Sequence, residues 1–369
     1  MRPVYVAGSG TFLPGDPIPY REIDRVLGPI EGASPAIRKW MERTGPLMGD
    51  LLDIDFVHYA IDPETRAFTE DNVTMAVKAA ERALAMAGRR AGDIDLICYG
   101  SAHQDQMPTA SARIQAALGI ERCDEFAIHS NCTSAYKALY LAHRLIASGR
   151  NACALVVSSS MASSELRGEY YNPRHLDKES LFLRWFLSDG AGALVLTAAP
   201  GPLRVEATYV ESLAGSKPSL MYNGRPALWM NPRDEYEQGL HHLKQRFRNA
   251  LSTDIFQESD GSVFYHGLRR MIEREGIAVD RVTRFQVNMP TRHIVESIVD
   301  ECARLGIARS TLYTRLDRLG YCGPPMALIC LDSILREERL APTDRVLSFV
   351  TEVSHFMQAG YCCEYVGGG

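Results

Sequence analysis

The stretch FAIHSNCTSAYKALYLAHRLIASG, residues 126–149, places a cysteine at a sharp change of pattern. Phe126 to Ile128 have the character of the end of a buried strand, and the apolar residues after Ser134 recur at helical spacing. Cys132 is therefore expected at a strand–helix junction, beside free backbone N–H groups and the positive end of the helix dipole, which favour a thiolate. A small buried hydrophobe is the other role open to such a cysteine, and this stretch alone does not decide between the two.

The composition is typical of a soluble globular protein with two domains or two halves of one. The chain has 369 residues, of which 46% are hydrophobic and 23% charged, with a formal net charge of -5. This mild acidity argues against nucleic acid as the main partner. Nine cysteines without a CxxC pair indicate a reducing compartment and no zinc site. Because no signal peptide and no long apolar run occur, we expect a cytoplasmic protein that contacts no membrane.

Strand and helix patterns alternate along the chain, which predicts an α/β fold with a mostly parallel sheet. Strands are predicted at residues 4–10, 93–102, 124–130, 152–160, 192–198, 281–290 and 345–353, and helices at 72–88, 108–120, 133–148, 263–277, 292–307 and 322–340.

Two segments share one plan and indicate an internal duplication. Residues 132–159 and 322–353 each run through a turn, an apolar helix, a short polar connection and a strand. We therefore expect two similar halves, residues 1–199 with the cysteine and residues 200–369, with the two helices packed centrally.

Residues 160–186 and 211–262 fit this repeat poorly. Insertions of this kind are usually surface caps, and in an enzyme they often form walls of the substrate pocket. The second insertion carries Lys244, Arg246 and Arg248, which could face an acidic carrier protein. A solvated helix face is the other explanation for that run of positive charge.

Four segments together resemble the β-ketoacyl-acyl-carrier-protein synthase III group of the thiolase superfamily. They are WMERTGP (40–46), MPTASARIQAALGI (107–120), HSNCTSAYKALYLAHRLIASG (129–149) and FLSDGAGALVL (186–196). The resemblance extends over nearly the full length and implies a thiolase-like five-layered α-β-α-β-α fold and a homodimer. It also implies that Cys132 is the nucleophile that takes an acyl group as a thioester, whereas Asp189 is expected to be structural. A cysteine at a helix N-terminus suits that chemistry, because its own N–H can stabilise an oxyanion.

The chain departs from the family at two active-site positions. Decarboxylating members carry a His and an Asn that stabilise an enolate. Counting from Phe285 places Asn288 at the His position and Thr291 at the Asn of the same motif. Tyr321 falls at the second Asn position. Decarboxylation of a malonyl thioester by the usual pair is therefore not expected.

A substitute base is offered by the segment TEVSHFMQAGY, which replaces a Gly-rich loop of the family. The register from Gly360 places the backbone donor of the oxyanion hole at Phe356, so His355 is predicted to stand beside Cys132 and to act as the base. Glu352 would orient His355. A half-buried histidine bonded to a carbonyl is the alternative.

Further positions are carried over from the family's binding sites. Trp40 and Arg43 resemble residues that hold the two ends of coenzyme A, and Arg292 lies one place from a basic family position. Met107 matches a position that reaches across the dimer into the partner's acyl pocket. His129 is expected to be a core or interface residue. No metal or cofactor is implied, because coenzyme A or phosphopantetheine only carries the acyl group.

The function implied is that of an acyltransferase. Cys132 would take an acyl group from an acyl-CoA or acyl-carrier protein and pass it to a small-molecule acceptor in specialised-metabolite, fatty-acyl or polyketide biosynthesis. Two alternatives stay open. One is a Claisen-condensing enzyme in which Asn288 and His355 replace the lost pair. The other is a non-catalytic subunit that supports a homologous partner.

Overall fold

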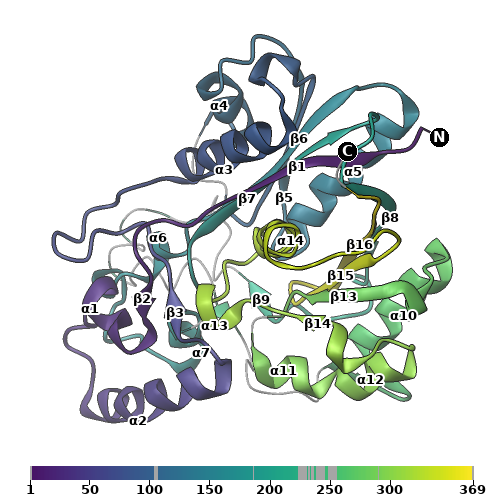
Figure 1. Cartoon of the computed structure of the whole chain (residues 1–369). Helices are drawn as coiled ribbons and strands as arrows, with labels where there is room; N and C mark the ends of the chain where they lie inside the picture. The colour runs from purple at the N-terminus through teal and green to yellow at the C-terminus, as the bar shows by residue number, and fades with distance from the viewer. Residues whose placement is uncertain are drawn as a thin grey trace.

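A ten-stranded sheet runs through the protein (Figure 1). The computed structural model describes residues 2–103, 107–185, 187–222, 256–289 and 291–367, with a few positions between 231 and 247. The strand order is β14-β13-β15-β16-β8-β1-β7-β6-β4-β5. The strands are β1 (Tyr5–Phe12), β4 (Leu96–Ser101), β5 (Asp124–His129), β6 (Cys153–Ser160), β7 (Gly190–Thr197), β8 (Leu203–Ser212), β13 (Val282–Val287), β14 (Leu312–Tyr313), β15 (Arg345–Glu352) and β16 (Met357–Tyr365).

The sheet consists of two sets of five strands with the same order and orientation. In the first set β5, β4 and β6 are parallel, and β7 and β1 follow as antiparallel neighbours. In the second set β14, β13 and β15 are parallel, and β16 and β8 follow in the same way. The sets meet where β1 pairs with β8, through Tyr5 with Arg204 and Val6 with Leu203. The internal repeat predicted from the sequence is therefore present in the strand topology.

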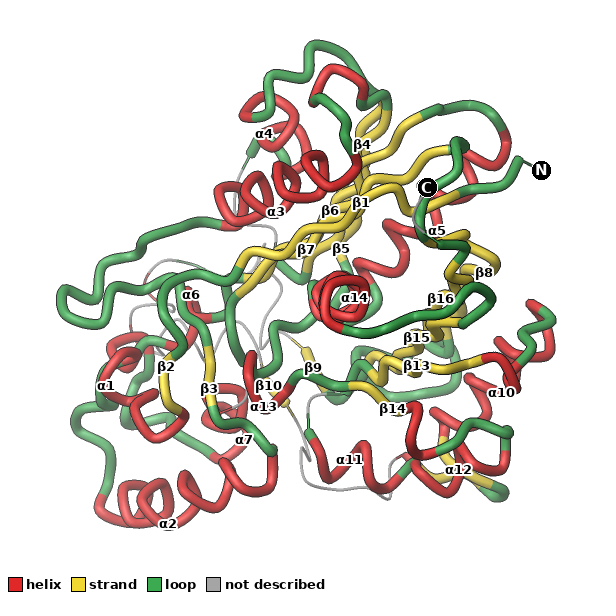
Figure 2. Tube along the Cα trace, viewed as in Figure 1, coloured by secondary structure: helices red, strands yellow, loops and turns green. Residues whose placement is uncertain are grey.

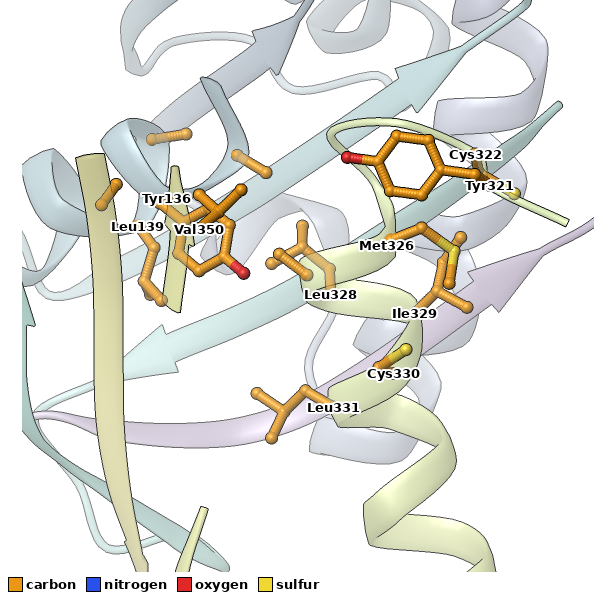
Figure 3. Close-up of a cluster of buried hydrophobic side chains, with 14 of the residues drawn as sticks. Tyr136, Leu139, Tyr321, Cys322, Met326, Leu328, Ile329, Cys330, Leu331 and Val350 are labelled. Atoms are coloured by element: carbon orange, nitrogen blue, oxygen red, sulfur yellow. The ribbon is translucent and has the colours of Figure 1, made fainter. Parts of the chain in front are cut away.

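Helices lie in three layers around these two sets of strands (Figures 1 and 2). The outer layers are α3 (Asn72–Ala87) with α4 (Ala110–Ala117), and α10 (Val263–Glu275) with α11 (Arg292–Ser297) and α12 (Val299–Arg304). Between the sets lie α5 (Ser134–Ser148) and α14 (Met326–Glu337), whose apolar side chains meet in the central core (Figure 3). This is the five-layered α/β architecture that was predicted.

Glycines let the two central helices approach the sheet closely. A Cβ atom at Gly100 of β4 would lie 2.3 Å from the backbone oxygen of Ser134, at the start of α5. A Cβ at Gly192 of β7 would lie 2.7 Å from the Cβ of Leu328 in α14. Real Cβ atoms do not come so close to other heavy atoms, so both positions require glycine. The contact at Gly100 fixes the N-terminus of α5, two residues after Cys132.

The remaining elements surround this core. They are α1 (Ile23–Leu27), α2 (Pro35–Leu52), α6 (Ser163–Leu166), α7 (Lys178–Phe182), α13 (Leu316–Leu319), β2 (Ile18–Pro19), β3 (Phe56–Val57), β9 (Met221–Tyr222), β10 (Arg246–Phe247), β11 (Gln257–Glu258) and β12 (Gly261–Ser262), with 3-10 turns between them. In the described ranges, no helix combines the length and the apolarity needed to cross a bilayer.

The structure corrects several sequence predictions. The strand before Cys132 is not buried, because β5 is an edge strand and the side chain of Phe126 is 40% exposed. The single helix predicted at 292–307 is divided at Ile298 into α11 and α12. Residues 160–186 are no mere surface cap, since the fully buried Arg184 donates to the carbonyls of Leu166 and Gly28. The prediction for Lys244, Arg246 and Arg248 concerns side chains outside the described residues.

Asp189 has the structural role that was expected. Its side chain is fully buried, and its oxygens accept hydrogen bonds from the backbone N–H groups of Ala60 (2.8 Å) and Ser163 (2.9 Å) and from the Ser163 hydroxyl (2.5 Å). Burial raises the pKa of Asp189 to about 6. The carboxyl group joins three segments just before β7 begins.

We expect Asp189→Ala to lower the free energy of unfolding by about 3 kcal/mol, because two buried N–H groups lose their acceptor. The matched control is Asp280→Ala, since the Asp280 side chain is 79% exposed, and it should change stability by no more than about 0.5 kcal/mol. Urea unfolding followed by circular dichroism measures both. Equal effects of the two variants would show that Asp189 has no such role.

Candidate active site

Cys132 lies in the turn that connects β5 to α5. The Ser134 N–H donates to the Asn131 carbonyl (3.0 Å), and the Lys137 N–H donates to the Thr133 carbonyl (2.9 Å), which is the first helical bond of α5. The predicted strand–helix junction is therefore confirmed. Its position is fixed by the contact of α5 with Gly100.

Cys132 faces a cavity whose walls come from both sets of strands. Ser160 lines it at the end of β6, and Asn288, Tyr321 and Thr351 line it from the second half. The other side chains of the wall are mostly apolar, including Leu187, Met221, Phe256, Phe264, Met289, Ile294, Ile298 and Val353. Met221 and Phe256 belong to the insertion at 211–262, which thus contributes to the wall as predicted. A cavity of this character suits an apolar group such as an acyl chain.

Tyr321 is in direct contact with Cys132. Its hydroxyl donates a hydrogen bond to the Cys132 Sγ over 3.1 Å, and the tyrosine is only 4% exposed. Tyr321 lies on the segment that leads into α14 (Figure 3). The structure therefore brings this predicted pocket residue to the reacting sulfur.

The surroundings of Cys132 favour the protonated thiol over the thiolate. Burial raises its pKa to about 12, and the negative charge of Glu352 acts in the same direction. The hydrogen bond from Tyr321 and the N–H of Cys132 itself lower the pKa, but they do not outweigh burial. The helix start therefore acts in the expected direction, but burial acts against it and has the larger effect on the pKa of Cys132.

Glu352, at the end of β15, is bound to the nucleophile turn. Its side chain is fully buried, and Oε2 accepts from the Thr133 N–H (2.9 Å), the Thr133 hydroxyl (2.5 Å) and the Ser130 hydroxyl (3.0 Å). Oε1 has no hydrogen-bond partner among the described residues. Glu352 was predicted to orient His355, but its bonds go to the turn beside Cys132 instead.

Asn288 presents an unpaired amide at the cavity wall. The residue follows β13 and is 3% exposed, yet neither Oδ1 nor Nδ2 makes a hydrogen bond of normal geometry within the described ranges; the amide lies close enough to the Tyr136 hydroxyl to act on it only weakly. By contrast, Gln286 on the same segment donates to the Met326 carbonyl (2.9 Å) and accepts from the Tyr361 hydroxyl (2.8 Å). An unpaired buried amide costs folding free energy and is therefore a mark of a binding group.

His355 does not lie where the sequence analysis placed it. It is exposed in the β15–β16 turn, its Nδ1 is 2.9 Å from the Lys217 carbonyl, and it is absent from the described cavity wall. His355 and Phe356 both have left-handed backbone, with φ of 57° and 53°. Phe356 is fully buried and packs edge-on against Phe256 at 5.5 Å between ring centroids. The alternative of a histidine bonded to a carbonyl matches this geometry.

Thr291 and Met107 also lie away from the described cavity wall. The Thr291 hydroxyl accepts from the Ile294 N–H (3.1 Å) and so caps α11. Met107 is 89% exposed. Its predicted place in a partner's pocket, and the homodimer itself, stay predictions.

The three residues predicted to hold coenzyme A come from neighbouring helices, α2 and α11. Trp40 packs against Trp185 at 5.1 Å between centroids, and Arg43 is exposed on the same helix. Arg292 makes an ion pair of 3.1 Å with Asp53, the C-cap of α2. Among the described residues these three form no part of the wall around Cys132, so coenzyme A binding stays a prediction.

His103 is a wall residue that the sequence analysis missed. It follows the end of β4, and its Nε2 lies 3.8 Å from Oε1 of the buried Glu165. An imidazole beside a carboxylate is the usual pairing of a general base. Its place after a strand of a parallel sheet was the one available signal. His129 is exposed and contacts the Ala102 carbonyl (3.1 Å) outside the described wall.

The five-layered fold, with a cysteine at the start of a central helix, can be compared with those of known proteins. Residues 126–212 match the family model for 3-oxoacyl-[acyl-carrier-protein (ACP)] synthase III. The β-ketoacyl-[acyl-carrier-protein] synthase III of Rhizorhabdus wittichii is 27% identical over 347 residues, 93% of this chain and 94% of the relative.

Solved structures show the same fold. The 3-oxoacyl-(acyl carrier protein) synthase III FabH of Pseudomonas aeruginosa PAO1 superposes with a TM-score of 0.74 at 18% identity, and 100% of both chains is covered. AbyA1, a tetronic acid condensing enzyme, superposes with a TM-score of 0.75 at 19% identity, covering 98% of this chain and 99% of that one. The predicted resemblance to the synthase III group is thus confirmed: the chain is similar to β-ketoacyl-[acyl-carrier-protein] synthases III in sequence and to condensing enzymes of this kind in fold.

We expect Tyr321→Phe to slow alkylation of Cys132 by iodoacetamide roughly 10- to 100-fold near neutral pH. A hydrogen bond to a charged group is worth about 1.5–3 kcal/mol, and its loss raises the pKa of Cys132 further. Intact-protein mass against time gives the rate. Tyr313→Phe is the matched control, because the buried Tyr313 hydroxyl has no hydrogen-bond partner among the described residues. If both variants react at the wild-type rate, Tyr321 does not support the thiolate.

Proposed function

We propose that this protein is an acyltransferase that forms an acyl thioester on Cys132. The observation that carries the proposal is the Cys132 Sγ on the wall of a mainly apolar cavity, with the Tyr321 hydroxyl donating to it. The donor is an acyl thioester of coenzyme A or of a carrier protein. The acceptor is a small molecule, and the setting is fatty-acyl, polyketide or specialised-metabolite biosynthesis.

In the acylation step Cys132 attacks the thioester carbonyl of the donor. The S–H bond of Cys132 breaks and its proton passes to the imidazole of His103, which is paired with Glu165. The Cys132 N–H, at the start of α5, supports the oxyanion that forms. The bond from the carbonyl carbon to the donor sulfur then breaks, and the departing thiol takes the proton from His103.

In the second step the acyl group leaves Cys132 for the acceptor. A nucleophilic oxygen, nitrogen, sulfur or carbon of the acceptor attacks the thioester carbonyl and gives up its proton. The bond from the carbonyl carbon to the Cys132 Sγ breaks, and Cys132 takes up that proton and is released as the thiol. The Asn288 amide, unpaired in the described structure, supports this step by a hydrogen bond to an oxygen of the acceptor or of the intermediate.

A Claisen condensation is the second candidate, and the same amide favours it. Asn288 Nδ2 can donate to an enolate oxygen, in the place where decarboxylating relatives use histidine. A non-catalytic supporting subunit fits less well, because such a subunit needs neither a thiol facing a cavity nor an unpaired amide beside it.

Incubation of the full-length protein with a panel of acyl-CoAs and acyl-carrier proteins should add the mass of one acyl group. We expect this gain to vanish in Cys132→Ala and to persist in Cys123→Ala, which removes another partly exposed free thiol. Intact-protein mass spectrometry measures the adduct and identifies the donor. The absence of an adduct with every donor would reject the acyl-enzyme.

The same time course tests the proton acceptor. His103→Gln should slow acylation by about 10²-fold or more, which is the usual contribution of a general base. His129→Gln removes a neighbouring imidazole that lies off the described wall, and we expect it to react at the wild-type rate. Slowing by His355→Gln alone would restore the assignment made from the sequence.

We expect Asn288→Leu to lower turnover of the acyl-enzyme while leaving its formation intact. The variant should also be more stable by about 1 kcal/mol, because it removes a buried amide that has no partner in the described ranges. Gln286→Leu is the control, for which the free energy of unfolding should fall instead of rise, since this variant breaks two buried hydrogen bonds. Decay of a preformed adduct and urea unfolding are the measurements, and an Asn288→Leu adduct that decays at the normal rate would exclude a role in the second step.

A further inference from the structure

We propose that Glu352 is a positioning residue that holds the turn of Cys132 and opposes formation of the free thiolate in the unloaded protein. The inference rests on the proposed function, in which Cys132 is acylated. It concerns a residue behind the cavity wall, because Glu352 is fully buried and is absent from the described lining. Substrate is therefore not expected to touch it.

The first observation is that hydrogen-bond donors at the N-terminus of α5 already have an acceptor, which is Glu352. A helix start stabilises negative charge through its free N–H groups. Here the Thr133 N–H, adjacent to Cys132, donates to Glu352 Oε2, and the hydroxyls of Thr133 and Ser130 do the same. One N–H of the helix start and two neighbouring hydroxyls are thus committed to a carboxylate and are not available to a thiolate, which keeps the Tyr321 hydroxyl and its own N–H.

The second observation is the charge that the buried carboxylate brings. Two negative groups in a dry site disfavour each other, so a carboxylate beside Cys132 opposes ionisation of the thiol. Glu352 Oε1 has no hydrogen-bond partner among the described residues, which leaves part of that charge uncompensated. The pKa of Cys132 is raised accordingly, with burial as the larger cause.

The third observation identifies the other groups around this charge. Lys137 of α5 donates to the Ser130 hydroxyl over 2.8 Å, and Ser130 in turn donates to Glu352. The structure records no direct ion pair between Lys137 and Glu352 in its described part, so the ammonium acts on the carboxylate across a hydroxyl. Tyr321 contacts Cys132 from the opposite half.

Acylation removes the conflict between the two groups. A thiolate next to Glu352 is disfavoured, whereas an acyl thioester on Cys132 carries no charge. The carboxylate therefore leaves the acyl-enzyme undisturbed and suppresses only the free thiolate. In the unloaded protein this protects the cysteine against alkylation and oxidation.

The decisive measurement is the pH profile of Cys132 alkylation in Glu352→Gln. Glutamine keeps a carbonyl acceptor for the Thr133 donors and removes the charge. We expect the profile to shift to lower pH by one unit or more, so that iodoacetamide modifies Cys132 about tenfold faster near pH 8. A merely structural role predicts an unchanged or slower reaction, and either of those results would overturn the proposal.

Lys137→Met provides an independent test in case Glu352→Gln does not fold, and it should change the rate of Cys132 alkylation in the opposite direction. Removal of the ammonium leaves the carboxylate charge less compensated, so alkylation of Cys132 should become slower and its profile should move to higher pH. Faster alkylation in this variant would contradict the proposal. Glu338→Gln, which alters a partly exposed carboxylate paired with Arg284, is the control that should leave the profile unchanged.

The two proposals fail in different ways. Loss of the proposed function appears as wild-type protein that takes no acyl group from any donor. Loss of the inference about Glu352 appears as an unshifted alkylation profile, whether or not an acyl group is transferred.

Discussion

The structure of the site depends on one buried contact, the hydrogen bonds between the Glu352 carboxylate and Thr133. Glu352 ends β15 of the second half, and Thr133 opens α5 of the first. The contact therefore crosses the interface between the two repeats and fixes the turn that holds Cys132. Gly100 of β4 packs against the same turn, because only glycine lets α5 start so close to β4. Backbone packing and a buried carboxylate together determine where the sulfur lies.

This arrangement places two physical requirements in opposition. A helix N-terminus favours a negative charge, but a mainly apolar cavity disfavours any charge. Burial has the larger effect on Cys132 and raises the pKa of its thiol. The hydrogen bond from Tyr321 to the sulfur lowers that pKa, and the charge of Glu352 raises it further.

The sequence predicted the layers and the repeat because strands β4, β6 and β7 and helices α5 and α14 carry strong apolar patterns. It did not reveal α2, where Gly45, Pro46 and Gly49 interrupt the helical pattern, nor β8 and β16, which complete the second set of strands.

Register counting correctly brought Tyr321 and Asn288 to the cavity wall. It failed for His355, because a count along the chain fixes a backbone position but not the direction of a side chain in a left-handed turn. His103 had no distinctive pattern, since its pairing with Glu165 arises only in the folded chain.

The two repeats have taken different parts in the site. The first supplies Cys132 and the helix that follows it. The second supplies Tyr321 and Glu352, which act on the sulfur, and the amide of Asn288, which lines the same cavity. A change in the second half can therefore alter the reactivity of Cys132 without moving the helix on which it depends. Proteins that share this fold can therefore keep the cysteine in the same position and still differ in how readily its thiol ionises. The position comes from one repeat, and the electrostatic environment comes from the other.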